Sequence, residues 1–204
     1  MSARPTIYPG LRGPLPIEVG EVHAPGSWGM LLLILTDAAV FGCLLASYFY
    51  LQAGSPEWPP DHIKKPDLGL VTINSLILWG SSIPIQWADS SIRKGHRGRL
   101  AVGYALGCLM GSVFVILVGV EYTLKDFSPQ SNVYGSLFFT ITGFHGLHVI
   151  AAVIMNAFIQ LRTWCGHFDA QRHLAVRNVS IFWHFVDLMW VFIYASLYLS
   201  PYAF

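Results

Sequence analysis

Six ionisable side chains lie within long apolar stretches of this 204-residue sequence, and they carry its possible chemistry. They are three acids and three histidines: Asp37, Glu121, His145, His148, His184 and Asp187. On insertion scales a charged group at the centre of an apolar span costs about 2.5–3.5 kcal/mol, so each needs a partner or a function. Such residues could bind a metal or a haem, transfer protons, or hydrogen-bond one helix to another.

The spacing of these residues places them in pairs. His145 and His148 are three residues apart, so both imidazoles project from one face of a helix. His184 and Asp187 have the same spacing, and we expect them to pair directly, which offsets the cost of burying the carboxylate. Glu121 lies near the end of another apolar run, and we expect it to brace a loop beside Lys125.

Metal or haem binding is the less favoured interpretation of the histidines. A haem held by two imidazoles needs histidines at matched depth on facing helices, and only His184 could partner His145 or His148. Zinc or copper would need further cysteine, histidine or carboxylate ligands, and only Asp187 could contribute. We therefore predict no catalytic residue, no metal ligand and no cofactor ligand in this chain.

The elements that position these residues are transmembrane helices. Charged residues make up 11% of the sequence and hydrophobic residues 54%, which excludes a soluble enzyme or a nucleic-acid-binding protein. Each apolar run is near or above the ~20 residues that cross a hydrocarbon core, and only helices satisfy their backbone there. We predict an all-α membrane protein, a bundle of five transmembrane helices at 28–51, 68–88, 100–122, 134–161 and 179–199. An extended, proline-rich arm, 1–27, precedes this single domain, 28–204.

The distribution of lysine and arginine predicts the orientation of the bundle. Nine of the twelve fall on the side of the N-terminus and of the second and fourth loops: Arg4, Arg12, Arg93, Lys94, Arg97, Arg99, Arg162, Arg172 and Arg177. The other side has Lys64, Lys65 and Lys125. Because cytoplasmic loops are enriched in these residues, we predict a cytoplasmic N-terminus and a periplasmic C-terminus.

Small residues predict where helices approach one another closely. Gly103, Gly107 and Gly111 repeat every four residues in the third span, and the first span has Ala38, Gly42 and Ala46 at the same spacing. In lipid, helices associate through close backbone packing at such positions. We expect both stripes to be helix–helix contact surfaces.

Depth along the spans predicts a polar cluster in the inner half of the bundle. Counted from the inner helix ends, Asp37, His148 and Asp187 fall in neighbouring layers. The fifth span also has a polar face that includes Tyr194 and Tyr198. The cluster could hold the helices together, or it could hold or pass protons.

Two stretches are far more specific than composition: 142–149, TGFHGLHV, and 182–190, FWHFVDLMW. Together they closely resemble the two signature helices of subunit III of the haem–copper oxidases, the cytochrome c oxidase family. The segment 120–136 and the residues around Asn74 and 81–82 are similar to the same family. The resemblance covers about 28–199, nearly the whole chain.

The resemblance implies a subunit without redox centres in an aa3-type terminal oxidase of a bacterial cytoplasmic membrane. Haem and copper are then expected in subunits I and II. Subunit I would be the main contact, with subunit II and small subunits as further partners. The family implies bound phospholipid, support of proton uptake and stabilisation of subunit I.

Some features leave alternatives open. Longer family members have seven spans, and this chain has no match to the first two, which partly line the family's lipid-binding cleft. Asp37 resembles the quinol oxidase members, whereas Asn74 resembles those that use cytochrome c. A related subunit of nitric oxide reductases has the same number of spans. Outside this family, a di-haem membrane cytochrome or a small transporter with its path at Asp37 and Asp187 would also fit.

Overall fold

The structure, a computed structural model, describes residues 25–60, 63 and 68–203. Its helices are α1 (Pro25–Ala53), α2 (Leu68–Ile92), α3 (Arg97–Thr123), α4 (Val133–Trp164) and α5 (Leu174–Ile193). A π-helix, η2 (Tyr194–Leu199), and a short helix, α6 (Ser200–Ala203), continue α5. Five helical segments are long and apolar enough to cross a membrane, which confirms the predicted all-α bundle. Of the predicted arm 1–27, the last three residues belong to α1 and the rest lies outside the described residues.

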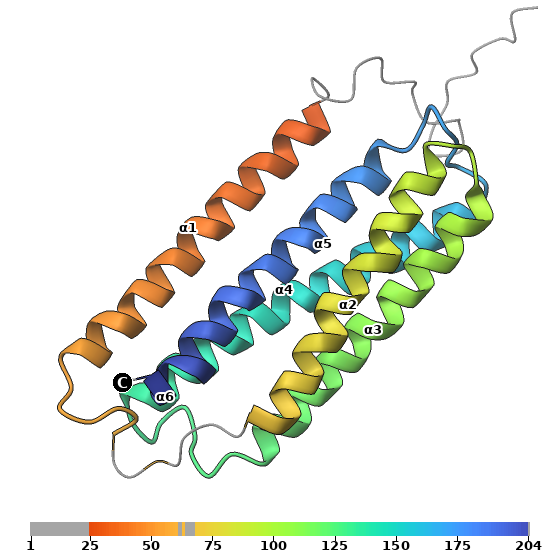
Figure 1. Ribbon diagram of the computed structural model, residues 1–204. Coiled ribbons are helices and arrows are strands. Elements are labelled where there is room, and N and C mark those ends of the chain that lie inside the picture. Colours follow the sequence, from red (N-terminus) through yellow and green to blue (C-terminus); the bar gives the residue numbers. More distant parts are fainter. Residues whose placement is uncertain (1–24, 61–62, 64–67, 204) are drawn as a thin grey trace, which may run out of the picture.

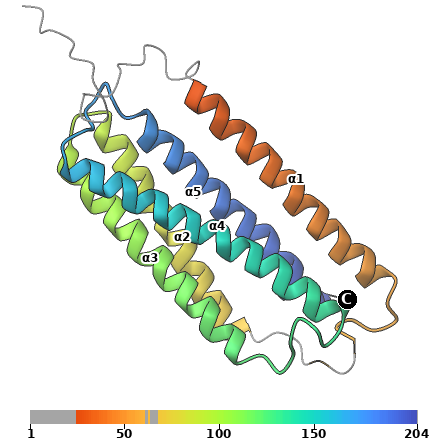
Figure 2. The same cartoon turned by 180° about the vertical axis from the view of Figure 1, so that it is seen from behind.

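The helices run roughly parallel or antiparallel to one another in an elongated bundle (Figure 1). α2 packs against α3, α3 against α4, and α5 against α2 and α4. α1 lies at the edge of the bundle in both views, next to α5 (Figure 2), and its main contacts with the other described helices are to α5 and α4. Large apolar side chains such as Leu109, Ile116 and Ile154 are more than 60% exposed, as lipid-facing residues of a membrane protein are.

Each helix extends beyond the apolar run that predicted it. α5 begins at Leu174, five residues before the predicted start, because polar residues such as Arg177 and Asn178 interrupt the apolar pattern without breaking the helix. α2 likewise continues past Asp89 to Ile92. The helices are therefore longer than the hydrocarbon core, and their ends reach the depth of the lipid headgroups.

Glycines bring α3 close to its neighbours. A Cβ atom on Gly103 would lie 2.5 Å from the carbonyl oxygen of Pro84 in α2, and one on Gly111 would lie 2.6 Å from Trp183 of α5. Gly107 lies against Ile85. The stripe in α1 differs, since a Cβ on Gly42 would meet no described atom within 4 Å. The close contact expected at Gly42 is therefore not made within the described part of the chain.

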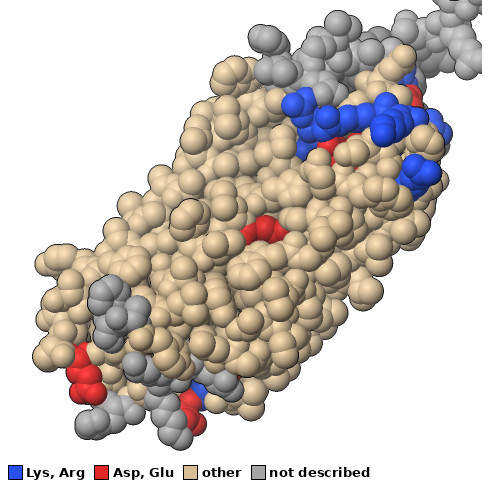
Figure 3. Space-filling view, in the orientation of Figure 1, with Lys and Arg blue, Asp and Glu red and all other residues tan. Residues whose placement is uncertain are grey.

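Charged side chains are concentrated at the ends of the bundle (Figure 3). Of the lysines and arginines in the described ranges, seven belong to the end at which α2 and α4 finish and α3 and α5 begin, and Lys125 belongs to the other end. The middle of the face in Figure 3 is uncharged apart from one group of acidic atoms. This distribution accords with a transmembrane orientation, while the side on which each end lies stays a prediction.

Candidate functional site

The six predicted residues form several separate groups. Of the cluster expected from depth, Asp37 and His148 do meet, whereas Asp187 contacts Ser82 of α2 instead. Asp37 and His148 connect α1 to α4, and His145 connects α4 to α5. His184 and Asp187 face α2, and Glu121 lies at the opposite end of the bundle from the arginines. Depth alone could not separate these groups, because it does not say towards which neighbour each helix face points.

Asp37 and His148 form an ion pair or hydrogen bond between α1 and α4. Nε2 of His148 lies 3.3 Å from Oδ2 of Asp37, and their side chains are 13% and 22% exposed. Nδ1 of the same imidazole lies 2.8 Å from the carbonyl oxygen of Phe144. Because that carbonyl can only accept, Nδ1 carries a hydrogen, and Nε2 is the atom that faces the carboxylate. This contact fixes the edge helix α1 to the rest of the bundle.

His145 is completely buried in an aromatic setting. Its Nε2 lies 3.2 Å from the carbonyl oxygen of Val186 in α5, and its ring centre lies 4.7 Å from that of Trp190 and 5.8 Å from that of Phe114. Since a carbonyl only accepts, Nε2 donates the hydrogen bond. His145 therefore joins the two helices that carry the TGFHGLHV and FWHFVDLMW stretches.

Two tryptophans of the second stretch bind hydroxyl groups of α2. Trp183 donates from Nε1 to Oγ of Ser81 at 2.9 Å, and Trp190 donates from Nε1 to Oγ of Ser75 at 2.8 Å. All four residues are buried. The indoles fill the space between α2 and α5 and satisfy their only polar atom there.

His184 and Asp187 are linked through a third side chain, Ser82 of α2. The Ser82 hydroxyl contacts Oδ2 of Asp187 and lies 2.9 Å from Nδ1 of His184. The direct pairing expected from their spacing is therefore replaced by a serine from the facing helix. On its other side, Nε2 of His184 lies 3.0 Å from Oε1 of Gln86, an exposed residue. Asp187 is only 6% exposed.

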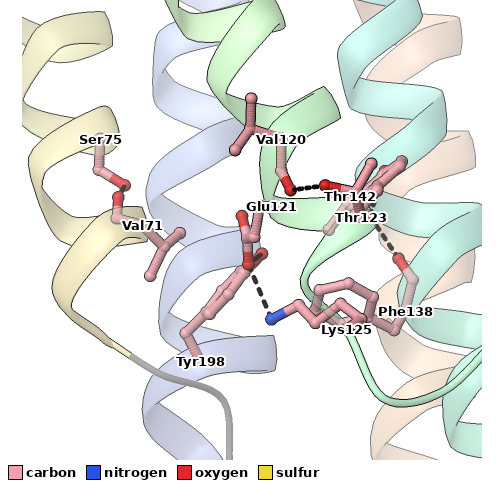
Figure 4. Close-up of polar contacts among 10 residues, drawn as sticks. Val71, Ser75, Val120, Glu121, Thr123, Lys125, Phe138, Thr142 and Tyr198 are labelled. Carbon is pink, nitrogen blue, oxygen red and sulfur yellow. Dashed lines mark hydrogen bonds and ion pairs between the residues drawn. The ribbon is translucent and has the colours of Figure 1, made fainter.

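A fourth group lies at the other end of the bundle, between α3, η2 and the loop after α3 (Figure 4). Nζ of Lys125 lies 2.8 Å from Oε1 of Glu121, and the hydroxyl of Tyr198 donates to the same oxygen at 3.0 Å. The ammonium group also lies 4.9 Å from the ring centre of Phe138. The contact to Lys125 agrees with the loop-bracing role expected for Glu121, and the two charged side chains are only 11% and 7% exposed, so the ion pair is largely shielded from solvent.

Sequence reasoning missed the partners that α2 and η2 provide. Ser82 stands in a segment whose family resemblance assigns it no role, Gln86 gives no signal of its own, and the polar face that includes Tyr198 does not identify Glu121 as its partner. A polar pair near the arginine-bearing end, Asp89 with Arg93, also escaped notice because it adjoins a loop. A search for polar residues at helical spacing along α2 (75, 82, 86 and 89) would have found most of them.

The geometry favours hydrogen bonding and proton exchange over metal binding. The three intramembrane histidines face three different helices: α5 for His145, α1 for His148 and α2 for His184. Among the residues that the structure describes, no three histidine, cysteine or acidic side chains lie close enough together to hold a metal ion. The groups present can accept, donate and hold protons inside an otherwise apolar bundle.

Comparison with known proteins identifies relatives along the whole membrane-spanning region. A sequence profile of the family "Cytochrome c oxidase subunit III" matches residues 20–202. Cytochrome c oxidase subunit 3 of Thermostichus vulcanus is 34% identical over 172 residues, which covers 84% of this chain and 85% of the relative. The same subunit of Coturnix japonica is 35% identical over 200 residues, 95% of this chain and 71% of the relative. That of Oncorhynchus clarkii is 37% identical over 177 residues, 84% of this chain and 68% of the relative.

Proposed function

The chain belongs to the cytochrome c oxidase subunit III family, and we propose that it is a subunit without redox centres in a proton-pumping haem–copper terminal oxidase. In this proposal the oxidase is of the aa3 type and lies in a bacterial cytoplasmic membrane. Haem and copper reside in subunits I and II. This chain stabilises subunit I, its main partner, and supports the uptake of protons.

The observation that carries the proposal is the way in which the two family stretches meet. They form facing parts of α4 and α5, where His145 binds the Val186 carbonyl and the Trp190 ring packs against the imidazole. Trp183 and Trp190 then bind serines of α2. The residues that define the resemblance are thus mutually bonded, which supports a scaffold that presents a fixed surface to a neighbouring subunit.

The engagement of the histidines supports the absence of a redox centre. His145 and His148 each use one ring nitrogen on a carbonyl oxygen, and His148 uses the other on Asp37. A di-haem cytochrome would need two of the three imidazoles to face one another across a haem, and they point towards different helices. The same contacts argue against a transport path through Asp37 and Asp187, since these residues lie in separate groups.

The proposed electron donor is cytochrome c. Asp37 and Asn74 gave opposite indications at the level of sequence, whereas the relatives described above are all named as cytochrome c oxidase subunits. Bound phospholipid is a further part of the proposal, since the lipid-facing surface of α1 is wide and apolar. Of the residues in α1, only Phe41 and Tyr48 are buried.

Affinity purification of the chain from its native membranes tests the proposed function. A tag at the C-terminus should recover a haem–copper subunit I in equal amount, together with the absorption bands of a-type haem. As a matched pair of variants, Leu109→Ala changes a lipid-facing side chain that is 61% exposed, and His145→Ala removes the buried contact to α5. We expect the first to preserve recovery of subunit I and the second to reduce it, because a buried donor is lost and a cavity is left. Recovery of the chain alone, or with haem that persists after subunit I is removed, would contradict the proposal.

A further inference from the structure

The contacts between Asp187, Ser82, His184 and Gln86 form an unbroken series that runs between α5 and α2. Ser82 contacts Oδ2 of Asp187 and Nδ1 of His184, and Nε2 of His184 contacts Oε1 of Gln86. These are three consecutive contacts among four side chains. None of the four has a role in the contacts between α4 and α5 described above.

The series descends from one membrane surface into the middle of the bilayer. Gln86 lies six residues, or about 9 Å, from the end of α2 that is followed by Arg93 and Lys94. Ser82 and His184 each lie about 15 Å from that end of their helices, and Asp187 lies about 20 Å from it. Gln86 is exposed, His184 is half-buried and Asp187 is buried. The outer end is thus within reach of headgroup water, while the inner end is not.

Counting hydrogens shows that the series needs one proton more than a carboxylate, a serine hydroxyl and a neutral imidazole supply. Each of the three contacts must contain one hydrogen, because two lone pairs at this distance repel. The Gln86 oxygen is an acceptor, so Nε2 of His184 carries the first hydrogen, and the Ser82 hydroxyl carries the second. The third must belong either to the Asp187 carboxyl or to Nδ1 of His184. A carboxylate beside a neutral imidazole would leave one contact without a hydrogen.

We propose that Asp187 and His184 share one proton, which passes between them through the hydroxyl of Ser82. In the first form, Asp187 is a carboxylic acid that donates to Ser82, and Ser82 donates to the neutral imidazole. In the second, the acid proton has moved to Ser82 Oγ while the proton of Ser82 has moved to Nδ1 of His184. This leaves a carboxylate and an imidazolium, with no change in total charge and no electron transferred. Gln86 accepts from Nε2 in both forms, so the heavy atoms stay in place.

The uncharged form is the resting one, because two neutral partners avoid the desolvation cost of a carboxylate and an imidazolium in lipid. Several other ionisable groups on the elements around α5 have their own partners. On α2, Asp89 binds Arg93; on α1 and α4, Asp37 binds His148; and His145 of α4 donates to the backbone of α5. Tyr104 of α3 donates to the Val176 carbonyl. The other carboxyl oxygen of Asp187, Oδ1, is buried and has no hydrogen-bond partner among the described atoms, so the series ends there.

This inference deepens the proposed function and rests on it, since it assigns a proton-holding site to a subunit proposed to support proton uptake. The site would store one proton about 20 Å from the arginine-bearing end of α5 and exchange it with that surface through the imidazole. Its ligand is the proton alone, and no metal or cofactor takes part.

Infrared difference spectroscopy of the purified oxidase complex tests the shared proton. The carbonyl stretch of a protonated carboxyl should be present in the wild type and absent in Asp187→Asn, which assigns it. On transfer to D₂O the Asp187 band should shift as its proton exchanges. Ser82→Ala should slow this exchange at least tenfold, because the hydroxyl that relays the proton is gone. Ser82→Thr, which keeps a hydroxyl, should exchange within about threefold of the wild type.

Exchange at the wild-type rate in Ser82→Ala, or the lack of any band that Asp187→Asn removes, would overturn the proposal. Should Ser82→Ala fail to retain the subunit, Gln86→Leu provides a second test at an exposed position. Loss of the outer acceptor should shift the Asp187 band, whereas the control Ile83→Leu, at a residue 74% exposed, should not. An unshifted band in Gln86→Leu would equally overturn it. These spectra concern complexes that contain subunit I, so a failure to recover that subunit refutes the proposed function instead.

Discussion

Lys125 offers a test of how much the ion pair with Glu121 stabilises the bundle, because among the described residues its ammonium group is the basic partner of the buried Glu121 carboxylate. The change Lys125→Met keeps most of the side-chain volume over the Phe138 ring but removes the charge. Removing one partner of a buried ion pair costs about 3–5 kcal/mol, because the remaining charge is left uncompensated. The side chains are 11% and 7% exposed, so little discount for solvent screening applies.

The measurement is the midpoint temperature at which this subunit unfolds or leaves the purified complex. For a chain of this size 1 kcal/mol corresponds to about 2–4 °C, so Lys125→Met should lower the midpoint by about 6–20 °C. The double change Glu121→Gln with Lys125→Met should lower it by far less, because no buried charge is left and Tyr198 can still donate to the amide oxygen. The exposed Lys94→Met is the control, with an expected effect below about 0.5 kcal/mol.

Additive losses in the double variant would refute the reasoning, because independent residues add and coupled ones do not. So would a loss in Lys125→Met no larger than that in Lys94→Met. Either result would mean that the Glu121 carboxylate finds other compensation, and that the contact in Figure 4 contributes little to the stability of this end of the bundle.

Three further predictions follow from the contacts between helices. Gly103→Ala should lower the midpoint of the same thermal transition, at a cost of about 1–3 kcal/mol, because its methyl group would meet the backbone oxygen of Pro84. The control Gly42→Ala should change the stability by less than about 0.5 kcal/mol. Asp37→Asn and His148→Gln should each weaken retention of the subunit in detergent. The double variant should lose less than the sum of the two single losses, since Nε2 of His148 and Oδ2 of Asp37 are 3.3 Å apart. Strictly additive losses would show that the two residues act separately. Cysteines placed in the loop 93–96 should resist membrane-impermeant thiol reagents added from the periplasm to sealed cells, and rapid labelling there would reverse the predicted orientation.

The sequence predicted the number, type and approximate position of the helices because lipid imposes a strong length and composition rule on every span. It could not predict the true helix ends, which lie in the headgroup region where that rule no longer applies. Leu174 and Ile92 are therefore both outside the predicted spans. Close packing at Gly103 could be expected from small-residue spacing, but the exposed position of Gly42 depends on where α1 lies, which spacing does not tell.

The polar residues were found from their cost in lipid, but their partners were not. The sequence could not identify Ser82 as the partner of Asp187, because the register between α2 and α5 is set by packing and not by either sequence alone. The partners of Tyr194 and Tyr198 could not be predicted either, because both residues lie in the π-helix η2. Their spacing predicts one polar face of the fifth span, whereas Tyr194 contacts Thr72 of α2 and Tyr198 donates to Glu121 of α3.

The central claim, that this chain supports a haem–copper oxidase without holding a redox centre, is tested most directly by removing it. The measurement is haem and copper per subunit I, together with oxygen consumption, in the purified oxidase before and after this subunit is stripped away by detergent. We predict that the metal content stays unchanged and that oxygen consumption persists at first but declines faster during turnover. Loss of haem or copper in proportion to the loss of this chain would contradict the account.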